Sequence, residues 1–337
     1  MLVKVGVLQF FSWPERRVPL NEVYRRALDR IDVMDRSGYD AVWLAEHHFN
    51  SFSVCPSVHL MGMHVADRTT HLRIGMAVTL AAFYHPLRIA EEVALLDVLS
   101  GGRVNWGAGR GFDRTEHTAF GVTADDSYPR FREHVEIVRA AWTTDRLTHH
   151  GRFWDFDDVE VLPKPVQQPH PPMWMASGSP EAIHWAAQQG YSILMDPHSS
   201  HDEIGRKHRL YQEALVAAGH SAEGRETPMA RLLAVAATRA EAEDIARRGA
   251  AWTVDAYVNP GHQAILPGRA QESAALDGTI DPVERYVDDV VLWGTPSEVI
   301  DKVAELQETI GLNYLMCAPL SHSSFELFTT QVLPKVV

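Results

Sequence analysis

Cysteine is scarce in this sequence, because the 337 residues contain only Cys55 and Cys317. Two cysteines do not make the disulfide framework of a small secreted domain, and they fit the reducing environment of the cytosol. Residues 1–17, MLVKVGVLQFFSWPERR, lack the basic start, long apolar core and small-residue cleavage site of a signal peptide. We therefore expect a cytoplasmic protein.

Positive charge and long apolar runs are also lacking. The chain has 31 Lys and Arg residues against 44 Asp and Glu residues, which gives a formal net charge of -13. This excess of acid leaves no basic footprint for nucleic acid or for an anionic membrane surface. No apolar run reaches the roughly 18 residues of a membrane span. We expect no nucleic acid and no membrane as partners, and an anionic ligand would need a local positive site.

The sequence does contain strand-like apolar runs that alternate with amphipathic helical stretches. This pattern predicts parallel strands joined by helices, and eight such units favour a closed (β/α)8 TIM barrel as a single domain over residues 1–337. A doubly wound open sheet is the alternative, but the first turn, QFFSWPERR, lacks the glycines typical of that fold. Irregular segments at 143–172 and 253–293 are expected as insertions after the fourth and seventh strands. The predicted strands are 3–10, 41–46, 72–80, 103–109, 172–177, 191–195, 230–238 and 313–319.

Polar residues gather at the predicted carboxyl ends of several of these strands. In barrel enzymes this end of the strands carries the active site. The cluster therefore predicts a functional site rather than a random surface. Its members are Glu46, His47 and His48 after the second strand, Arg110 after the fourth, and Ser177, Gly178 and Ser179 after the fifth.

The segment 176–187, ASGSPEAIHWAA, is a candidate anion site. Ser179 is well placed to cap a helix that has Pro180 at its first position, and Gly178 permits close approach to the backbone. The free N–H groups of such a first turn attract anions, and Arg110 offers a compensating positive charge. A simple helix start explains Ser-Pro-Glu equally well on its own. Together with Arg110, a phosphate is favoured.

The glycines of GRVNWGAGRG, residues 102–111, do not form a dinucleotide fingerprint. Phe112 occupies the place of the third glycine, and no acidic residue ends a following strand at the right distance. Asn105, Gly107 and Gly109 share one face of the strand, where small residues leave room for a flat, bulky group. Tight packing inside the barrel explains the same glycines, so both interpretations stay open.

His47 and His48 suggest a metal site, but the rest of the sequence disfavours one. Neighbouring residues of a strand point to opposite sides, and neither an HExxH motif nor paired cysteines occur. Barrel metallohydrolases have His-x-His after the first strand, where this chain has Gln9-Phe10-Phe11. A single imidazole acting as general acid or base requires less, and His47 is the candidate. His48 fits a satisfied core histidine about as well as a functional one.

Several segments together resemble the bacterial luciferase-like family of flavin-dependent monooxygenases. The similarity runs in order along most of the chain and is weakest across 143–170 and 253–290. Glu46-His47-His48 resembles the luciferase branch more than the deazaflavin (F420) branch, in which Asp-His-Phe is usual. The resembling segments are GYDAVWLAEHHF (38–49), residues 73–111, PMWMASGSPEAIHWAAQQGY (172–191) and GTPSEVIDKV (294–303).

The resemblance implies a (β/α)8 barrel that binds reduced FMN (FMNH2) and usually forms a homodimer. It also implies insertion of one oxygen atom of O2 into a small organic substrate through a C4a-hydroperoxyflavin. By position, His47 matches the catalytic histidine, and Arg110 matches the phosphate-binding arginine. The other predicted cofactor-binding residues are Ala77 and Val78, whose peptide bond matches a cis bond behind the flavin ring, together with Asn105, Ser177, Gly178 and Ser179.

Departures from the family pattern refine these expectations. Gly109 replaces a luciferase cysteine, Ser177-Gly178 replaces an acid-serine pair, and no convincing match to the luciferase mobile loop follows the seventh strand. A non-luminescent relative is therefore expected. Because the chain has no dinucleotide motif, we expect a separate flavin reductase to supply FMNH2.

Aromatic residues suggest an apolar environment for the flavin and for the substrate. Early-strand aromatics are candidates for a wall that shields a reactive flavin from water, although core packing explains each of them too. Those in or beside the irregular regions mildly favour an apolar substrate. The first group is Trp13, Phe49, Phe83, Tyr84 and Trp106, and the second is Phe153, Trp154, Phe156, Trp252 and Tyr257.

Three other functions remain as alternatives. One is an F420-dependent oxidoreductase that transfers hydride without oxygen. A phosphate-binding barrel enzyme without flavin would need a catalytic lysine, but no predicted barrel strand ends in one. The third is a non-catalytic flavin-binding barrel, which His47 and the phosphate residues disfavour.

Overall fold

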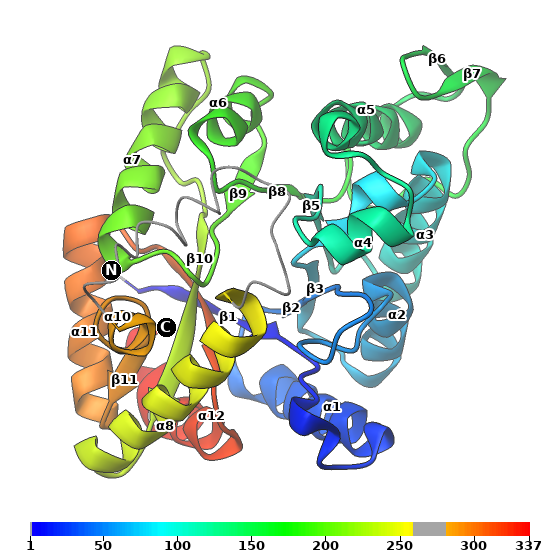
Figure 1. Ribbon diagram of the computed structural model, residues 1–337. Coiled ribbons are helices and arrows are strands. Elements are labelled where there is room, and N and C mark those ends of the chain that lie inside the picture. The colour runs from blue at the N-terminus through cyan, green and yellow to red at the C-terminus, as the bar shows by residue number, and fades with distance from the viewer. Residues whose placement is uncertain (1, 259–280) are drawn as a thin grey trace. The chain divides into compact units, whose positions relative to one another are not determined.

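The computed structural model describes residues 2–258 and 281–337, and part of the second predicted irregular segment lies outside these ranges. Figure 1 shows the chain with most of its helices and strands labelled. The described residues divide into two compact units. Unit 1 comprises residues 2–8, 175–258 and 281–337, and unit 2 comprises residues 9–174. A single domain over residues 1–337 stays a prediction.

Unit 2 alternates parallel strands with helices. Its strands β2, β3 and β5 are neighbours in that order, the short β4 pairs with β5, and β6 and β7 form an antiparallel hairpin. The elements are α1 (Leu20–Ser37), β2 (Ala41–Leu44), α2 (Val58–Arg68), β3 (Arg73–Met76), β4 (Thr79–Leu80), α3 (Pro86–Ser100), β5 (Val104–Gly109), α4 (Arg114–Ala119), α5 (Ala124–Thr143), β6 (Leu147–His150) and β7 (Asp155–Val159).

The local sequence explains where these elements start and stop. Ser57 caps α2 by accepting a hydrogen bond from the N–H of Leu60, and α1 ends at Gly38, which has φ of 85°. This left-handed conformation suits glycine because it has no Cβ. Inside the unit, the buried indole of Trp43 lies directly against Gly75 of the neighbouring strand, where any Cβ would overlap the ring. Gly75 therefore lets the large side chain fill the core.

Unit 1 has a second set of parallel strands. Strands β11, β10, β12 and β1 are neighbours in that order. The last residue of β1 and the first two of β8 belong to unit 2. The elements are β1 (Lys4–Gln9), β8 (Met173–Ala176), α6 (Pro180–Gln188), β9 (Ser192–Leu194), α7 (His201–Ala217), β10 (Pro228–Val235), α8 (Arg239–Thr253), α10 (Pro282–Asp289), β11 (Leu292–Gly294), α11 (Pro296–Ile310), β12 (Tyr314–Pro319), α12 (His322–Leu327) and α13 (Leu333–Val336).

The prediction of an α/β fold with parallel strands is confirmed, and each predicted strand has a counterpart. The predicted strand 72–80 is divided into β3 and β4 at Ala77–Val78, whose peptide bond is cis as the resemblance implied. The predicted loop at 143–172 contains the β6–β7 hairpin as short extended pieces.

Three details of the prediction were wrong. The short helix α4 was not predicted, because its start signal is a single capping residue, Asp113. Helix α5 begins at Ala124 instead of near Ser127, since the Thr123 hydroxyl caps it by accepting from the N–H of Asp126. The three-residue strand β11 lies in the region expected to be irregular, and it is too short to show a periodic pattern.

Candidate active site

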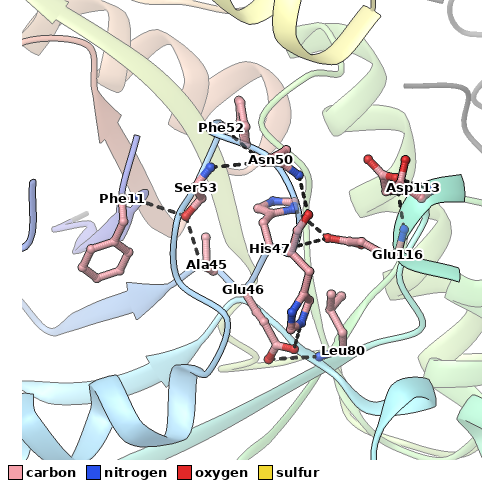
Figure 2. Close-up of polar contacts among 12 residues, drawn as sticks. Phe11, Ala45, Glu46, His47, Asn50, Phe52, Ser53, Leu80, Asp113 and Glu116 are labelled. Carbon is pink, nitrogen blue, oxygen red and sulfur yellow. Dashed lines mark hydrogen bonds and ion pairs between the residues drawn. The ribbon is translucent and has the colours of Figure 1, made fainter. Parts of the chain in front are cut away.

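The segment that follows β2 brings an acid and two imidazoles into the buried part of unit 2. Glu46 is only 2% exposed, and its carboxylate accepts hydrogen bonds on both oxygens (Figure 2). Oε1 lies 3.0 Å from Nε2 of His48 and accepts from the Tyr84 hydroxyl at 2.9 Å, and Oε2 accepts from the N–H of Leu80 at 3.5 Å. These contacts make His48 a satisfied core histidine, which was one of its two interpretations.

His47 has a different environment. Its Nδ1 lies 3.5 Å from Oε1 of Glu116, and its ring is largely buried among aromatic side chains. The rings of Phe52 and Phe112 meet it edge-on, with centroids 5.3 and 6.1 Å away, and the Phe10 ring is stacked at 6.5 Å. An imidazole beside a carboxylate in an apolar surrounding is suited to acid–base chemistry with water excluded.

Glu116 was not identified from the sequence. It lies on α4 with no exposed surface, and its Oε1 also accepts from the backbone N–H of His48 at 2.9 Å. Asp113 caps this helix by accepting from the N–H groups of Thr115 and Glu116 (Figure 2). In DRTE (113–116), Asp113 precedes Glu116 by three residues, and this spacing is typical of the start of a helix. It predicts the helix but not the contact with His47, which is 69 positions earlier (116 minus 47).

Buried side chains also hold β4, which directly follows the cis Ala77–Val78 bond. The Thr79 hydroxyl lies 3.0 Å from Nε2 of His59, whose Nδ1 lies 2.9 Å from the carboxylate of Glu92. The hydrogen bond to His59 is the largest cause that lowers the pKa of Glu92. Since the Leu80 N–H donates to Glu46, both residues of β4 are tied to neighbouring elements. These hydrogen bonds therefore fix β4, the strand that directly follows Ala77 and Val78.

Arg110 follows β5 directly and faces the start of α5. Its Nη1 lies 3.4 Å from the Ser127 hydroxyl, and its guanidinium carbon lies 4.8 Å from the centroid of the Tyr128 ring. The Arg132 guanidinium approaches the same ring at 4.2 Å. Burial, and to a lesser degree the charge of Arg110, lowers the pKa of the neighbouring His117. Two guanidiniums at one ring form a local positive site in an acidic chain, and Arg132 was not identified from the sequence.

Asn105 lies at the other end of β5 from Arg110. It is the second residue of the strand and pairs in register with Gly75. Its side-chain oxygen accepts from Nε and Nη2 of Arg73 at 2.9 and 2.7 Å. The structure therefore places Asn105 near the amino ends of the strands, and its predicted role at the cofactor stays a prediction.

The predicted phosphate residues after β8 belong to unit 1. Ser179 caps α6 as expected, accepting from the N–H of Ala182, and Pro180 is the first helical residue. Ser177 is buried, and its hydroxyl donates to the carbonyl of Met175. A Cβ added at Gly178 would meet no atom within 4 Å. The helix start is confirmed, and the binding role of Ser177, Gly178 and Ser179 stays a prediction.

The aromatic residues nearest His47 differ from those suggested by the sequence. The ring of Trp106 packs edge-on against Trp142 of α5 at 5.2 Å, in the layer between strand and helix. Phe49 and Phe83 instead pack against Phe120, with ring centroids 5.5 and 5.0 Å away. Because strand alternation does not reveal which loops fold back over a strand end, Phe10, Phe52 and Phe112 could not be singled out.

Two further features, a metal-ligand cluster and a membrane-spanning helix, are absent from the residues that the structure describes. Within residues 2–258 and 281–337, no group of three or more His, Cys, Asp or Glu side chains is arranged to hold a metal ion. The same part of the chain has no helix that is both long and apolar enough to cross a membrane.

The family of the chain follows from comparison with known proteins. Residues 3–312 match the family described as luciferase-like monooxygenase, so the chain belongs to this family. It is 32% identical over 186 residues to the oxygenase component of flavin-dependent trigonelline monooxygenase from Acinetobacter baylyi, a match that covers 54% of this chain and 51% of that protein. The chain therefore spans about half the length of this relative. Alkanal monooxygenase alpha chain from Photorhabdus luminescens is 24% identical, with 90% of this chain and 88% of that protein covered.

Solved structures agree on the fold. The monooxygenase RslO1 from Streptomyces bottropensis superimposes with a TM-score of 0.84 at 25% identity, covering 99% of this chain and 100% of that one. The oxygenating constituent of 3,6-diketocamphane monooxygenase from Pseudomonas putida, solved with FMN, gives a TM-score of 0.83 at 21% identity, covering 100% of this chain and 99% of that one. The predicted luciferase-like TIM barrel class is confirmed.

Proposed function

We propose that this protein is a monooxygenase that uses reduced FMN and O2 to insert one oxygen atom into a small, apolar organic substrate. The observation that carries the proposal is the environment of His47, a buried imidazole beside Glu116 among three aromatic rings. Membership of the luciferase-like monooxygenase family supports the same chemistry.

His47 is the proposed acid–base group. It follows a core strand directly, and its backbone N–H donates to the carbonyl of Cys55 at 3.2 Å, which holds the segment in place. From there the imidazole takes a proton from the reacting group or returns one to it. The surrounding phenyl rings exclude water, which would otherwise compete for that proton and destroy a reactive flavin.

The residues present fit a flavin cofactor. Reduced FMN supplies the electrons that activate O2, and its phosphate needs a positive site in a chain with a net charge of -13. Arg110 and Arg132, at the ring of Tyr128, offer that site in unit 2. In unit 1, the open space at Gly178 would admit a phosphate close to the backbone, so Ser177, Gly178 and Ser179 remain proposed ligands. Ala77 and Val78 are the proposed support of the flavin ring.

A separate flavin reductase is the proposed source of reduced FMN. A matched relative is named as the oxygenase component of its system, which supports such a division of labour. We further propose a homodimer in the cytoplasm. Leu60 of α2 and Leu95 and Leu99 of α3 are exposed apolar side chains on two helices that pack together in unit 2, which supports a contact with a second copy. Sedimentation velocity on the purified protein tests the dimer.

The first experiment is an anaerobic titration of the protein with reduced FMN, followed by rapid mixing with oxygenated buffer. We expect tight binding that weakens at least tenfold in Arg110→Ala, and a transient absorbance that precedes the spectrum of oxidised FMN. The matched control is Arg114→Ala, an exposed arginine at the start of α4, which should bind as the wild type does. Reduced FMN that fails to bind would contradict the proposal, and binding of F420 instead would favour hydride transfer.

The reductase proposal has its own control. The purified protein with FMN should oxidise NADH slowly and without saturation. Rapid, saturable oxidation would show that the chain reduces its own flavin. A protein that binds reduced FMN but alters neither its reaction with O2 nor any product would instead be a non-catalytic flavin-binding barrel.

A further inference from the structure

Several hydrogen bonds fix the position of Glu116, although its helix has only six residues. The Asp113 carboxylate accepts from the N–H groups of Thr115 and Glu116 at 2.7 and 3.4 Å, which fixes the first turn of α4. The Glu116 side chain then reaches the segment after β2, where Oε1 accepts from the N–H of His48 (Figure 2). Helix and loop are therefore joined through this one carboxylate.

These contacts involve only one oxygen of the Glu116 carboxylate, Oε1. Its residue has no exposed surface, and among the described residues Oε2 has no hydrogen-bond partner. Burying a carboxylate without full hydrogen bonding is costly, so a purely structural role would be better served by an amide or an apolar side chain. Its remaining contact is with Nδ1 of His47, 3.5 Å from Oε1.

We propose that Glu116 is the positioning residue of His47, an inference that rests on the proposed function. An imidazole that faces a carboxylate with Nδ1 carries its proton on that nitrogen. Nε2 of His47 is then the nitrogen that exchanges a proton with the reacting group. When Nε2 gains that proton, the imidazolium charge lies beside the Glu116 carboxylate, and the proton later leaves again from Nε2.

The neighbouring carboxylate, Glu46, provides the comparison. Both oxygens of Glu46 are occupied, by His48, Tyr84 and the N–H of Leu80. Its role in the structure is therefore accounted for by the contacts that it makes. Each of the two adjacent histidines therefore has its own buried acid. Glu46 holds His48 as part of the core, whereas Glu116 orients His47 for proton transfer.

The groups that surround His47 support this assignment. Glu116 from α4 places a carboxylate beside its ring, and the rings of Phe10, Phe52 and Phe112 pack around it. Aromatic rings confine an imidazole but do not select which nitrogen carries the proton. The Glu116 carboxylate therefore favours the tautomer that carries the proton on Nδ1.

The test is nitrogen NMR of the flavin-free protein with ¹⁵N-labelled histidine at pH 8, where the signal missing in His47→Gln identifies His47. We expect the wild type to carry the proton on Nδ1. Glu116→Leu, which has no acceptor, should lose that preference, whereas Glu116→Gln should keep it because its amide oxygen still accepts. Glu46→Gln is the control and should leave the His47 signal unchanged.

The wild-type spectrum alone can overturn the inference, even if Glu116→Leu does not fold. A His47 that carries its proton on Nε2, or one that is unaffected by Glu116→Leu, removes Glu116 from the role. Since no flavin is present, this outcome is independent of the proposed monooxygenase activity. In the flavin experiment, Glu116→Gln should bind reduced FMN normally but lower the yield of the oxygen-dependent transient about tenfold, because the imidazolium loses its counter-charge.

Discussion

Nε2 of His48 lies 3.0 Å from Oε1 of Glu46, a carboxylate that also accepts from Tyr84 and from the backbone of Leu80. Burial, followed by the charge and hydrogen bond of Glu46, raises the pKa of Tyr84, so this tyrosine stays protonated and donates to the carboxylate. His48 is therefore part of a closed hydrogen-bond network. His47, one residue earlier, lies outside this network beside Glu116 and is the proposed acid–base residue.

This distinction predicts opposite results for the two histidines. His47→Gln should lower oxygenation of a substrate by about 10²–10⁴-fold, the usual contribution of general acid–base catalysis. His48→Gln should instead lower the free energy of unfolding by about 1–3 kcal/mol, because Glu46 loses a buried partner. Urea unfolding and product formation, measured on both variants, check the prediction. Equal losses of activity would contradict it.

Tyr128 is predicted to order the two arginines of the proposed phosphate site. Tyr128→Leu removes the ring over which both guanidiniums lie, and each such contact contributes about 0.5–2 kcal/mol. We expect binding of reduced FMN to weaken about tenfold, measured by anaerobic titration. Tyr128→Phe keeps the ring and should bind nearly as the wild type does. If Tyr128→Leu also binds normally, the ring does not organise the site.

Replacing Gly75 or Gly178 by alanine is predicted to have different effects on the free energy of unfolding. Gly75→Ala places a Cβ into the Trp43 indole and should lower the free energy of unfolding by about 1–3 kcal/mol. Gly178→Ala meets open space, so its stability should change by less than about 0.5 kcal/mol. If the backbone at Gly178 binds the FMN phosphate, however, the same change should weaken FMN binding. Urea unfolding and FMN titration of both variants separate packing from binding.

His201 makes the stability of the protein depend on pH. It is 9% exposed at the start of α7, and burial, together with the charges of Arg231 and Lys302, lowers its pKa to about 3. Because the unfolded chain binds a proton near pH 6.5 and the folded chain does not, the contribution is present above pH 6.5 and is lost as the pH falls towards 3.

The predicted loss at pH 5, relative to neutral pH, is about 2 kcal/mol. Between pH 7.5 and pH 5, the free energy of unfolding of His201→Asn should fall by about 2 kcal/mol less than that of the wild type. Urea unfolding at both pH values measures the difference. Parallel losses in wild type and variant would show that other groups cause the acid sensitivity.

The signals that the sequence offers for the site are local. An apolar strand that ends in Glu-His-His predicts His47 as the acid–base residue, and Ser-Pro after a strand predicts the cap of α6, which the structure confirms. Asn105 was predicted at the cofactor from its face of the strand, but the structure shows it as the second residue of β5, near the amino end. What the pattern did not reveal is that Arg73 would hold its side chain.

The remaining parts depend on which elements meet in space. Phe10 and Phe52 lie in two separate loops, whereas Phe112 directly precedes the cap of α4 and Glu116 lies on that helix, so no local pattern marks these residues as one group. Arg132 lies four residues after Tyr128 on α5, so helix geometry explains that contact, whereas only the fold brings Arg110 to the same ring.

By itself, the sequence determined the alternation of strands and helices, the family and the histidine pair, since hydrophobic periodicity and short motifs are encoded by neighbouring residues. The tertiary structure alone decided which histidine faces which carboxylate. Contacts between residues about 70 positions apart depend on how β2 and α4 are placed by the packed core, and no local pattern carries that information.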